Sequence, residues 1–539
     1  MTTPQPHAFL IVDHGAATVS AALIGRAGGA WRLIGNLAMP AGADLGPAIG
    51  VLVGRARAAD PALAAAIGII DTEAEALPRL EVRSRRPRRL AVVSGTDRTL
   101  AGLVATAARS GWRPSGASTE STDPLAMSRL LLEHGVEAIL VGAAEPPRAD
   151  ERAATRELAT LVAAVAERRP EIPIVLSGSM SEGLEVFGDV ATRPGEVVLA
   201  PAAIGLGGDY RQRDPLGALL LELALPPDDP RRALGPAVEA LAEVLDRRVE
   251  AIVLGHDAAM RAVAAPGAAG EPASLRLAVV PEAAVAPDDP DDAVVDGVLV
   301  WSTVPADRHR LRDRMRELRI APWSDGAGDG AALRMAAARA ALVRLAAATP
   351  MFDSAPVPDL VVAACGVWSA VPPPAVALAH IDVIRRPGAS QYALDHARLL
   401  GALGAIPDPG ERRLLMADLV DDLLAPLGTV VTPAGLRSGR SAGSVVVHSA
   451  DGPNAIDLSP GGLELVDLPP GLTAVAEFKF RDRVRLGGKG RHFAIDVAGG
   501  LGGLLVDLRD VPLRLPDRAD RRRDLLAAWQ ASLWAGAEA

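Results

Sequence analysis

The stretch FLIVDHGAATVSAALIG, residues 9–25, consists of two apolar runs joined by a short turn that contains Asp13 and Gly15. A strand that ends in an aspartate and turns at a glycine can direct backbone N–H groups at a phosphate, while the carboxylate reaches the accompanying Mg²⁺. An ordinary β-hairpin at the start of a buried sheet has the same pattern. The stretch therefore predicts a hairpin and leaves open whether that hairpin binds phosphate.

The segments around this stretch predict a meander followed by alternating strands and helices. From about residue 90, apolar runs alternate with helical patterns, which indicates a parallel sheet covered by helices. A second block of strands and helices begins near residue 210, and from about residue 430 short β-type segments are divided by Gly and Pro turns. The three strands of the meander are expected at residues 8–13, 18–24 and 31–38.

Two later segments carry predictions of their own. The acidic sequence PDDPDDAVVDG, residues 287–297, is predicted to be a loop, and the sequence VLVWSTV that follows it is predicted to be a strand. The sequence QYALDHARLLGALGAI, residues 391–406, is predicted to be a helix, on which Asp395 and His396 point about 100° apart. That angle disfavours a joint catalytic role for the two residues and favours a polar helix face.

Length and composition exclude several classes of protein. A chain of 539 residues is too long for one ordinary core and predicts two to four domains. The formal net charge of −10 argues against nucleic-acid binding, which needs a concentrated basic surface. Cys365 is the only cysteine, so intrachain disulfides and cysteine-held zinc sites are excluded. No secretory signal or membrane-spanning run is recognised, and we expect a cytoplasmic protein that does not bind membranes.

Lysine is almost absent from the chain. The two lysines, Lys479 and Lys489, both lie near the C-terminus, so the first 478 residues lack the lysine of a P-loop. A Schiff-base lysine is missing there for the same reason. Lys489 belongs to the basic, glycine-rich segment RLGGKGRHFAID, residues 485–496. This segment is predicted to be an exposed hairpin tip, with binding of an anion or a partner as the alternative.

The order of segments resembles the superfamily of actin, sugar kinases and heat-shock ATPases, whose first phosphate loop reads Asp-x-Gly between two strands. Within that superfamily, residues 8 to about 436 resemble the MutL family of glutamate mutase accessory proteins, which is unrelated to the mismatch-repair protein of that name. The segments that carry the resemblance are FLIVDHGAATVSAALIG, the pair VEAILVGA and IPIVLSGS, and DLVVAACGVW followed by ASQYALDHARLLGALGAI.

The resemblance implies a first phosphate loop in which Asp13 is the catalytic carboxylate and the Mg²⁺ ligand. Gly15 and Thr18 would contact the phosphates of ATP in the same loop. Ala16 and Ala17 stand where the family has Ser and Thr, so the hydroxyl expected directly after the glycine is missing.

Two further nucleotide loops are implied by the same resemblance. The second phosphate loop falls at AIVLGHDAAMRAV, residues 251–263, where Leu254 stands at the expected aspartate and Gly255 and Asp257 are the suggestive survivors. The adenosine loop falls at AACGV, residues 363–367, where Gly366 keeps the backbone open. All three loops have lost groups that phosphate binding uses, which argues against efficient ATP hydrolysis.

The fold that the resemblance implies is α/β: a two-lobed actin-like ATPase (ribonuclease H-like) fold with a C-terminal β-rich module. Residues 1–209 would form the first lobe with an inserted Rossmann-like α/β unit. Residues 210–436 would form the second lobe, and residues 437–539 the β-rich module with its terminal helix.

Three hypotheses about function follow. In the first, the chain is an accessory or chaperone-like protein for an adenosylcobalamin-dependent mutase, with weak or vestigial nucleotide binding. In the second, it is an active Mg-ATP-dependent ATPase or small-molecule kinase that uses Asp13. In the third, it is a non-catalytic interaction scaffold whose C-terminal module contacts the partner. The eroded loops favour the first and third hypotheses, in which the chain is not an enzyme.

Overall fold

The meander predicted at the N-terminus belongs to a four-stranded sheet. The computed structural model describes residues 7–69, 73–144, 149–179, 197–204, 214–267, 273–321, 327–437, 441–450, 452–509 and 511–533. The elements of the first lobe are β1 (Ala8–His14), β2 (Thr18–Ala27), β3 (Ala30–Pro40), α1 (Leu45–Ala59), α2 (Pro61–Ala66) and β4 (Arg79–Arg83). The strand order is β3-β2-β1-β4, with β1 antiparallel to β2 and parallel to β4. Ile49 and Val53 of α1 pack into the same core as Leu10 of β1, so this helix covers one face of the sheet.

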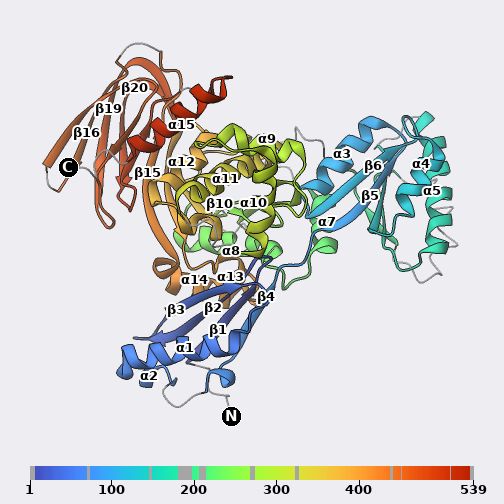
Figure 1. Ribbon diagram of the computed structural model, residues 1–539, viewed down its shortest axis with the longest axis horizontal. Coiled ribbons are helices and arrows are strands. Elements are labelled where there is room, and N and C mark those ends of the chain that lie inside the picture. The colour runs from blue at the N-terminus through green and yellow to red at the C-terminus, as the bar shows by residue number, and fades with distance from the viewer. Residues whose placement is uncertain are drawn as a thin grey trace.

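The alternating strands and helices that follow form a parallel five-stranded sheet, as predicted. Its elements are β5 (Arg88–Ser94), α3 (Asp97–Ala108), β6 (Trp112–Ser118), α4 (Pro124–Leu131), β7 (Val136–Gly142), α5 (Ala149–Arg168), β8 (Ile174–Ser177) and β9 (Val197–Ala200). The order is β6-β5-β7-β8-β9, and every pair is parallel. β7 is buried along nearly its whole length, which is typical of a parallel strand with helices on both faces. This inserted unit projects to one side of the molecule (Figure 1).

The sheet of the second lobe repeats the strand order of the first. Its elements are α7 (Pro215–Ala224), α8 (Pro230–Leu245), β10 (Val249–Leu254), β11 (Ala259–Ala265), β12 (Ser274–Val280), α9 (Asp292–Trp301), α10 (Arg308–Ile320), α11 (Gly328–Ala348), β13 (Leu360–Ala364), α12 (Pro373–Val383), β14 (Gly388–Asp395), α13 (Leu400–Gly404), α14 (Pro409–Leu423) and β15 (Leu424–Thr432). The strands β12-β11-β10 form an antiparallel meander with β13 parallel to β10, as β3-β2-β1 and β4 do in the first lobe. The chain therefore has the α/β, two-lobed actin-like ATPase fold.

The prediction of a strand at VLVWSTV is wrong, because this sequence contains the second half of α9. The helix already begins at Asp292, inside the segment predicted to be a loop, where the Asp291 carboxylate caps it by accepting the N–H of Val294 at 2.8 Å. Val295, Val298 and Trp301 are buried at spacings of three. The apolar residues thus follow the period of a helix, and the short run VLVW alone does not show that period.

The prediction of a helix over residues 391–406 is also wrong in its first half. Residues up to Asp395 belong to β14, which lies between β13 and β15 in the middle of the eight-stranded sheet. Only the five residues of α13 are helical. A buried central strand and a buried helix are both apolar over a short window, so the sequence pattern did not distinguish them. Asp395 and His396 accordingly lie at the end of a strand.

The C-terminal region forms a second β layer. Its elements are β16 (Gly443–Ser449), β17 (Gly452–Leu458), β18 (Leu463–Val466), β19 (Thr473–Leu486), β20 (Gly488–Ala498), β21 (Leu504–Asp507) and α15 (Ala519–Ser532). Four strands form a sheet in the order β17-β16-β19-β20, while β21 and β18 extend the second-lobe sheet beyond β15. The C-terminal β-rich module is thus joined to the second lobe by shared strands. The limits predicted at residues 209 and 436 stay predictions.

One hydrophobic core runs through both lobes. It contains Ile11 and Val82 of the first lobe together with Leu234 of α8 and Met416 of α14. The edge strand β3 is also fixed to α14, because the N–H of Trp31 donates to Asp418 at 2.9 Å. The lobes are therefore packed against each other over a continuous surface (Figure 1). No helix of the described ranges is long and apolar enough to cross a membrane.

Candidate functional site

The turns of the two lobes meet around one cavity of about 170 Å³. The β1–β2 turn lines it from the first lobe, while the β10–β11 turn and the loop after β13 line it from the second. All the residues proposed from the sequence line this cavity: Asp13, Gly15, Thr18, Gly255, Asp257 and Gly366. The structure thus brings the three predicted loops together, while the ligand roles of their residues stay predictions.

The two turns that face each other are built in the same way. A Cβ atom added at Gly15 would lie 2.9 Å from the carbonyl oxygen of Thr18, and one added at Gly255 would lie 2.7 Å from that of Ala258. Both positions require glycine, because the carbonyl oxygen of the residue three positions later lies too close to the place that a Cβ atom would take. Gly15 and Gly255 therefore occupy equivalent positions in the two lobes.

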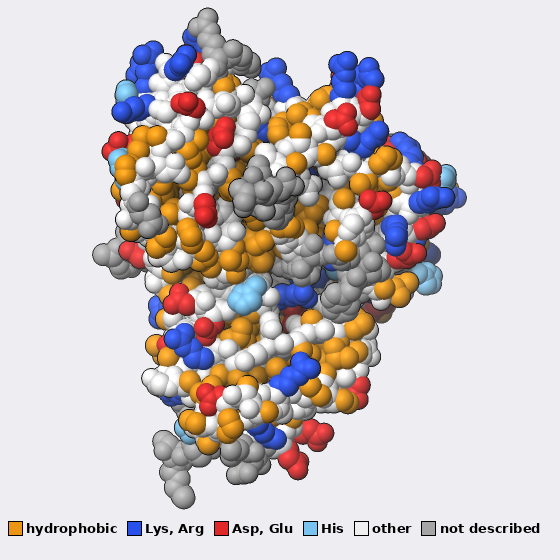
Figure 2. Space-filling view, turned by 60° about the vertical axis from the view of Figure 1, so that its left-hand side comes forward, with side chains coloured by type: hydrophobic (Ala, Val, Ile, Leu, Met, Phe, Trp, Pro, Cys, Tyr) orange, Lys and Arg blue, Asp and Glu red, His pale blue; other side chains and the backbone are white. Residues whose placement is uncertain are grey.

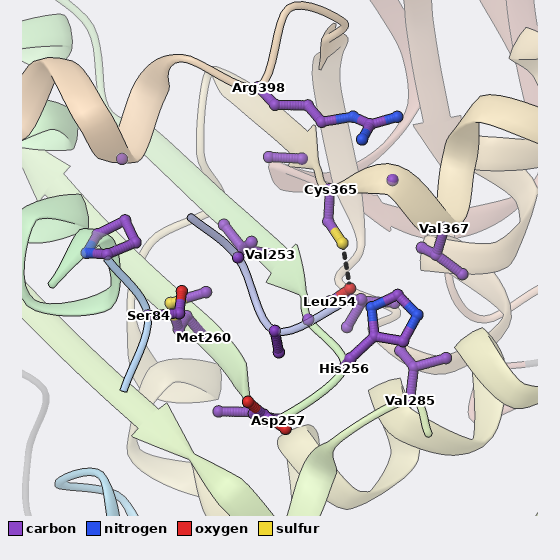
Figure 3. Close-up of a pocket in the computed structure, with 18 of the residues that line it drawn as sticks. Ser84, Val253, Leu254, His256, Asp257, Met260, Val285, Cys365, Val367 and Arg398 are labelled. Atoms are coloured by element: carbon purple, nitrogen blue, oxygen red, sulfur yellow. Dashed lines mark hydrogen bonds between the residues drawn. The ribbon is translucent and has the colours of Figure 1, made fainter. Parts of the chain in front are cut away.

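This equivalence corrects the alignment of the second loop by one residue. Asp13, which pairs with Ser20, lies two residues before Gly15, and Val253, which pairs with Met260, lies two residues before Gly255. Val253, and not Leu254, therefore stands where the second carboxylate would be. Its side chain lines the cavity (Figure 3). In either alignment the position is apolar and offers no ligand to a metal ion.

Asp13 is the polar group whose environment is most unusual. Its Oδ1 atom is shielded from solvent and has no hydrogen-bond partner among the described residues. Burial, together with the neighbouring carboxylates Asp229 and Asp395, raises the pKa of Asp13 to about 7, while Arg398 acts in the opposite direction. Around neutral pH this carboxyl group is consequently present in both its neutral and its ionised form.

Asp257, the second candidate carboxylate, is already occupied. Its Oδ1 lies 2.8 Å from Nη2 of Arg319, and the same guanidinium lies 2.8 Å from Asp288 through its Nε. Asp257 is largely buried, so this ion pair is shielded from water and from salt. In Figure 3, Asp257 lies at the far side of the pocket from Arg398. Asp257 therefore does not replace the carboxylate missing at Val253.

The loop after β13 places Cys365 and Gly366 beneath an arginine. Cys365 has a φ of 105°, and its thiol donates a hydrogen bond to the carbonyl oxygen of Leu254, which links this loop to β10 (Figure 3). Burial raises the pKa of the Cys365 thiol, so the neutral form persists. A Cβ atom at Gly366 would lie 3.2 Å from the guanidinium carbon of Arg398. The open backbone predicted for an adenosine loop is thus covered by a side chain.

Two residues of the site were not found from the sequence. Arg398 follows β14 with a φ of 59° and lines the cavity. His256 lies at the tip of the β10–β11 turn, and burial together with the guanidinium groups of Arg319, Arg334 and Arg398 lowers its pKa to about 4. His256 is therefore neutral at pH 7. Arg398 lies within the segment 391–406 that the sequence predicted to be a helix, and that prediction does not place it beside the loop of Gly366.

The residues present do not fit a Mg²⁺-bound nucleotide. Of the three carboxylates that line the cavity, Asp257 is paired with Arg319, and Asp395 accepts the N–H groups of Leu399 and Leu400. Asp13 is left as a single carboxylate donor, whereas a hard divalent cation is held by several oxygen ligands. In the part of the chain that the structure describes, no group of three or more His, Cys, Asp or Glu residues is placed to hold a metal ion.

The strand order of both lobes and the meeting of their turns define a protein with the actin-like ATPase fold. No family model matches the sequence, and no curated protein matches it significantly. The resemblance to the MutL family therefore stays a prediction.

Solved structures with a detectable likeness include three of the Ppx/GppA enzyme of Aquifex aeolicus, one of them described as the type II variant of a Ppx/GppA phosphatase. Each is 8% identical to this chain, with TM-scores of 0.18, 0.17 and 0.18. The first two comparisons each cover 67% of this chain, and 68% and 67% of the Aquifex aeolicus chains. The third covers 76% of this chain and 86% of the Aquifex aeolicus chain. At these TM-scores the likeness carries no weight, and the fold rests on the strand order.

Proposed function

We propose that the protein is a non-hydrolysing accessory protein that retains the actin-like fold and acts through protein contacts. The observation that carries this proposal is the state of the cavity carboxylates. Val253 replaces the second carboxylate, Asp257 is bound by Arg319 at 2.8 Å, and Asp13 remains alone. Hydrolysis of ATP in such a cleft would need a bound metal and a positioned water. The described residues of the cavity supply neither a set of metal ligands nor a second free acid.

The contact between the lobes supports the same function. An ATPase of this shape would open and close around its nucleotide, and such motion requires an interface that can separate. Here the hydrophobic core continues from the first lobe through α8 and α14, and β3 is hydrogen-bonded to α14. Opening the cleft would expose this core to water, at about 25 cal/mol for each Å² of apolar surface. A closed, stiff pair of lobes suits a protein that presents a surface.

The exposed face of β19 is the surface on which we expect the partner. The side chains of Lys479, Arg481, Arg483 and Arg485 all lie on this face, and Lys489 lies directly opposite Arg485 on β20. None of these five side chains takes part in an ion pair within the described residues. Figure 2 shows Lys and Arg side chains on both upper edges of the molecule, the end where Figure 1 places β19, β20 and α15. The hairpin tip predicted within residues 485–496 lies at Gly487, and the residues from Gly488 onward form β20.

Charge complementarity points to a protein with an acidic surface as the partner of this face. Unpaired cations on one sheet face attract an acidic patch of a partner, whereas the rest of this chain, whose net charge is negative, repels it. The face presents no row of exposed aromatic rings, so it lacks the stacking groups of a single-stranded nucleic-acid platform. The resemblance to glutamate mutase accessory proteins makes an adenosylcobalamin-dependent mutase the first partner to test.

Thermal melting tests the nucleotide half of the proposal. A ligand that binds only the native state raises its stability by RT ln(1 + [L]/Kd). We expect no shift of the melting temperature with millimolar Mg-ATP, and the same behaviour for Asp13→Ala. A shift with Mg-ATP that disappears in Asp13→Ala would instead support the hypothesis of an active ATPase or kinase.

Co-purification from the native host tests the partner half. We expect the wild-type chain to retain an acidic protein, and the double variant Arg481→Glu/Arg483→Glu to lose it. Arg55→Glu, a single charge reversal at an exposed residue of α1, is the control for a charge change elsewhere on the surface and should retain the partner. Recovery of the same partner by all three proteins would reject the β19 face. Recovery of a partner other than a cobalamin enzyme would remove the mutase.

A further inference from the structure

Two polar groups that face the cavity, the side chains of Arg398 and Asp13, lack hydrogen-bond partners among the residues that the structure describes. The side chain of Arg398 makes no hydrogen bond or ion pair with any described residue, although it is partly buried and lines the cavity (Figure 3). Oδ1 of Asp13 is shielded from solvent and has no hydrogen-bond partner within the same residues. Buried polar groups are nearly always satisfied in folded proteins, so a cationic donor and a carboxylate acceptor in one cavity indicate a ligand.

Most other charged groups of the cavity have partners among the described residues. Arg319 binds Asp257 at 2.8 Å, and Arg231 binds Asp229 at 2.6 Å through Nη2, although its Nη1 is buried without a hydrogen-bond partner in the described chain. The carboxylate of Asp395 accepts the N–H of Leu400 at 3.0 Å. The hydrogen-bonding groups that remain for a ligand are therefore guanidinium N–H donors, at Arg398 and at Nη1 of Arg231, and one acceptor oxygen at Asp13.

We propose that this cavity binds a compact oxyanion that also carries a hydroxyl group, with the oxyanion on Arg398 and the hydroxyl donating to Asp13. Inorganic phosphate, a small phosphate monoester and a small hydroxy acid all belong to this class. This proposal rests on the proposed function in one respect, since it requires that the cavity is not a Mg-ATP site.

The size of the cavity agrees with a compact ligand. Its volume of about 170 Å³ is close to the roughly 150 Å³ of an engineered cavity that admits benzene. Drug-sized ligands occupy pockets of roughly 300–1,000 Å³. Arg398 also covers Gly366, so a purine base would have to displace the guanidinium from the adenosine loop.

The acceptor at Asp13 makes the site selective for an anion that carries a proton. A carboxylate oxygen can only accept a hydrogen bond, so the ligand atom that faces it must donate one. Phosphate at pH 8 keeps one P–OH group, whereas sulfate has the same shape and charge but no hydroxyl. An unpaired acceptor of sulfate facing an unpaired carboxylate would leave two buried groups unsatisfied, which is costly. The site should therefore distinguish phosphate from sulfate.

Isothermal titration of the full chain at pH 8 and constant ionic strength, with inorganic phosphate and with sulfate, tests the proposal. We expect wild-type protein to bind phosphate about ten-fold or more tightly than sulfate. Arg398→Gln should weaken phosphate binding about ten-fold or more, and Asp13→Asn, which offers an N–H donor, should remove the preference for phosphate. Arg316→Gln, on the exposed side of α10, is the control that changes charge alone.

Gly366→Ala provides a second variant that retains both binding groups. Its Cβ would press against the Arg398 guanidinium, and we expect weaker phosphate binding with an unchanged far-ultraviolet circular dichroism spectrum. Glycerol phosphate and lactate, titrated in parallel, separate a phosphate monoester from a hydroxy acid as the preferred ligand. The proposal would be overturned if inorganic phosphate, glycerol phosphate and lactate all failed to bind. It would also be overturned if Arg398→Gln and Gly366→Ala bound them as the wild type does.

Failure of this proposal is distinguishable from failure of the proposed function. Turnover of ATP that depends on Asp13 would reject the non-hydrolysing function and this proposal together. No turnover and no binding of the three anions would reject the anion site alone and leave the accessory function standing.

Discussion

Replacing Asp13 by asparagine should stabilise the protein above neutral pH. Burial holds the pKa of Asp13 at about 7 instead of 3.8, so the folded state pays to ionise this carboxyl group. Because the pKa is raised in the folded state, the stability linked to Asp13 is fully present below pH 4 and is lost as the pH rises to about 7. A displacement from 3.8 to about 7 corresponds to about 4 kcal/mol, which is an upper bound. Asparagine has nearly the same shape and does not ionise.

Thermal melts of wild type and Asp13→Asn at pH 5 and pH 8 measure this effect. If the chain unfolds as one unit, about 4 kcal/mol corresponds to a rise of about 4 °C in melting temperature for Asp13→Asn at pH 8. At pH 5 the difference should be smaller, because wild-type Asp13 is then mostly neutral. Asp496→Asn, an exposed carboxyl on β20, is the control and should change little at either pH. Destabilisation by Asp13→Asn at pH 8 would refute the reasoning.

Three further predictions concern the hairpin, the histidine and the C-terminal layer. Gly255→Ala should destabilise the protein by about 1–3 kcal/mol, because the added Cβ would lie 2.7 Å from the carbonyl oxygen of Ala258. Gly50→Ala, which has open space on α1, should be neutral or slightly stabilising. Urea denaturation compares the two variants, and equal effects on stability would contradict the hairpin geometry. The wild-type protein should lose up to about 3 kcal/mol of stability between pH 6.5 and pH 4, because His256, with its pKa lowered to about 4, takes up a proton in the unfolded state before it does so in the folded state. His256→Gln should remove this loss. Acid denaturation curves of the same shape for variant and wild type would show that His256 does not cause it. Arg509→Met should lower the free energy of unfolding by about 3–5 kcal/mol, because it leaves the buried carboxylates of Asp507 and Asp382 with fewer partners. Arg518→Met, which breaks an exposed ion pair, should change stability little. Comparable melting temperatures for the two variants would show that the buried network is dispensable.

The parts of the fold that the sequence predicted are those in which local pattern and tertiary position agree. The N-terminal meander and the strand–helix units carry their periods within short windows, and both were confirmed. The segment 391–406 was mistaken for a helix because no residue of β14 is exposed and its burial does not alternate along the strand. Its identity depends on the neighbouring strands β13 and β15, which are distant in sequence.

The sequence predicted which loops form the candidate site, but not the ion pairs and the arginine that determine its charge. Asp13, Gly255 and Gly366 all line one cavity, because the strand–turn patterns that located their loops are local, and their roles as ligands stay predictions. The ion pair of Asp257 with Arg319 joins residues 62 positions apart, and no local signal predicts it. Arg398 could have been found only by identifying residues up to 395 as a strand parallel to β13, since the carboxyl ends of parallel strands share one edge of a sheet.

The most direct test of the central claim is a steady-state measurement of phosphate release from millimolar Mg-ATP by purified wild-type protein beside Asp13→Ala. Since Asp13 is the single cavity carboxylate without a partner in the described chain, we predict that the two proteins release phosphate at the same background rate. A wild-type rate well above that of Asp13→Ala would show that the cleft hydrolyses ATP and would contradict the account.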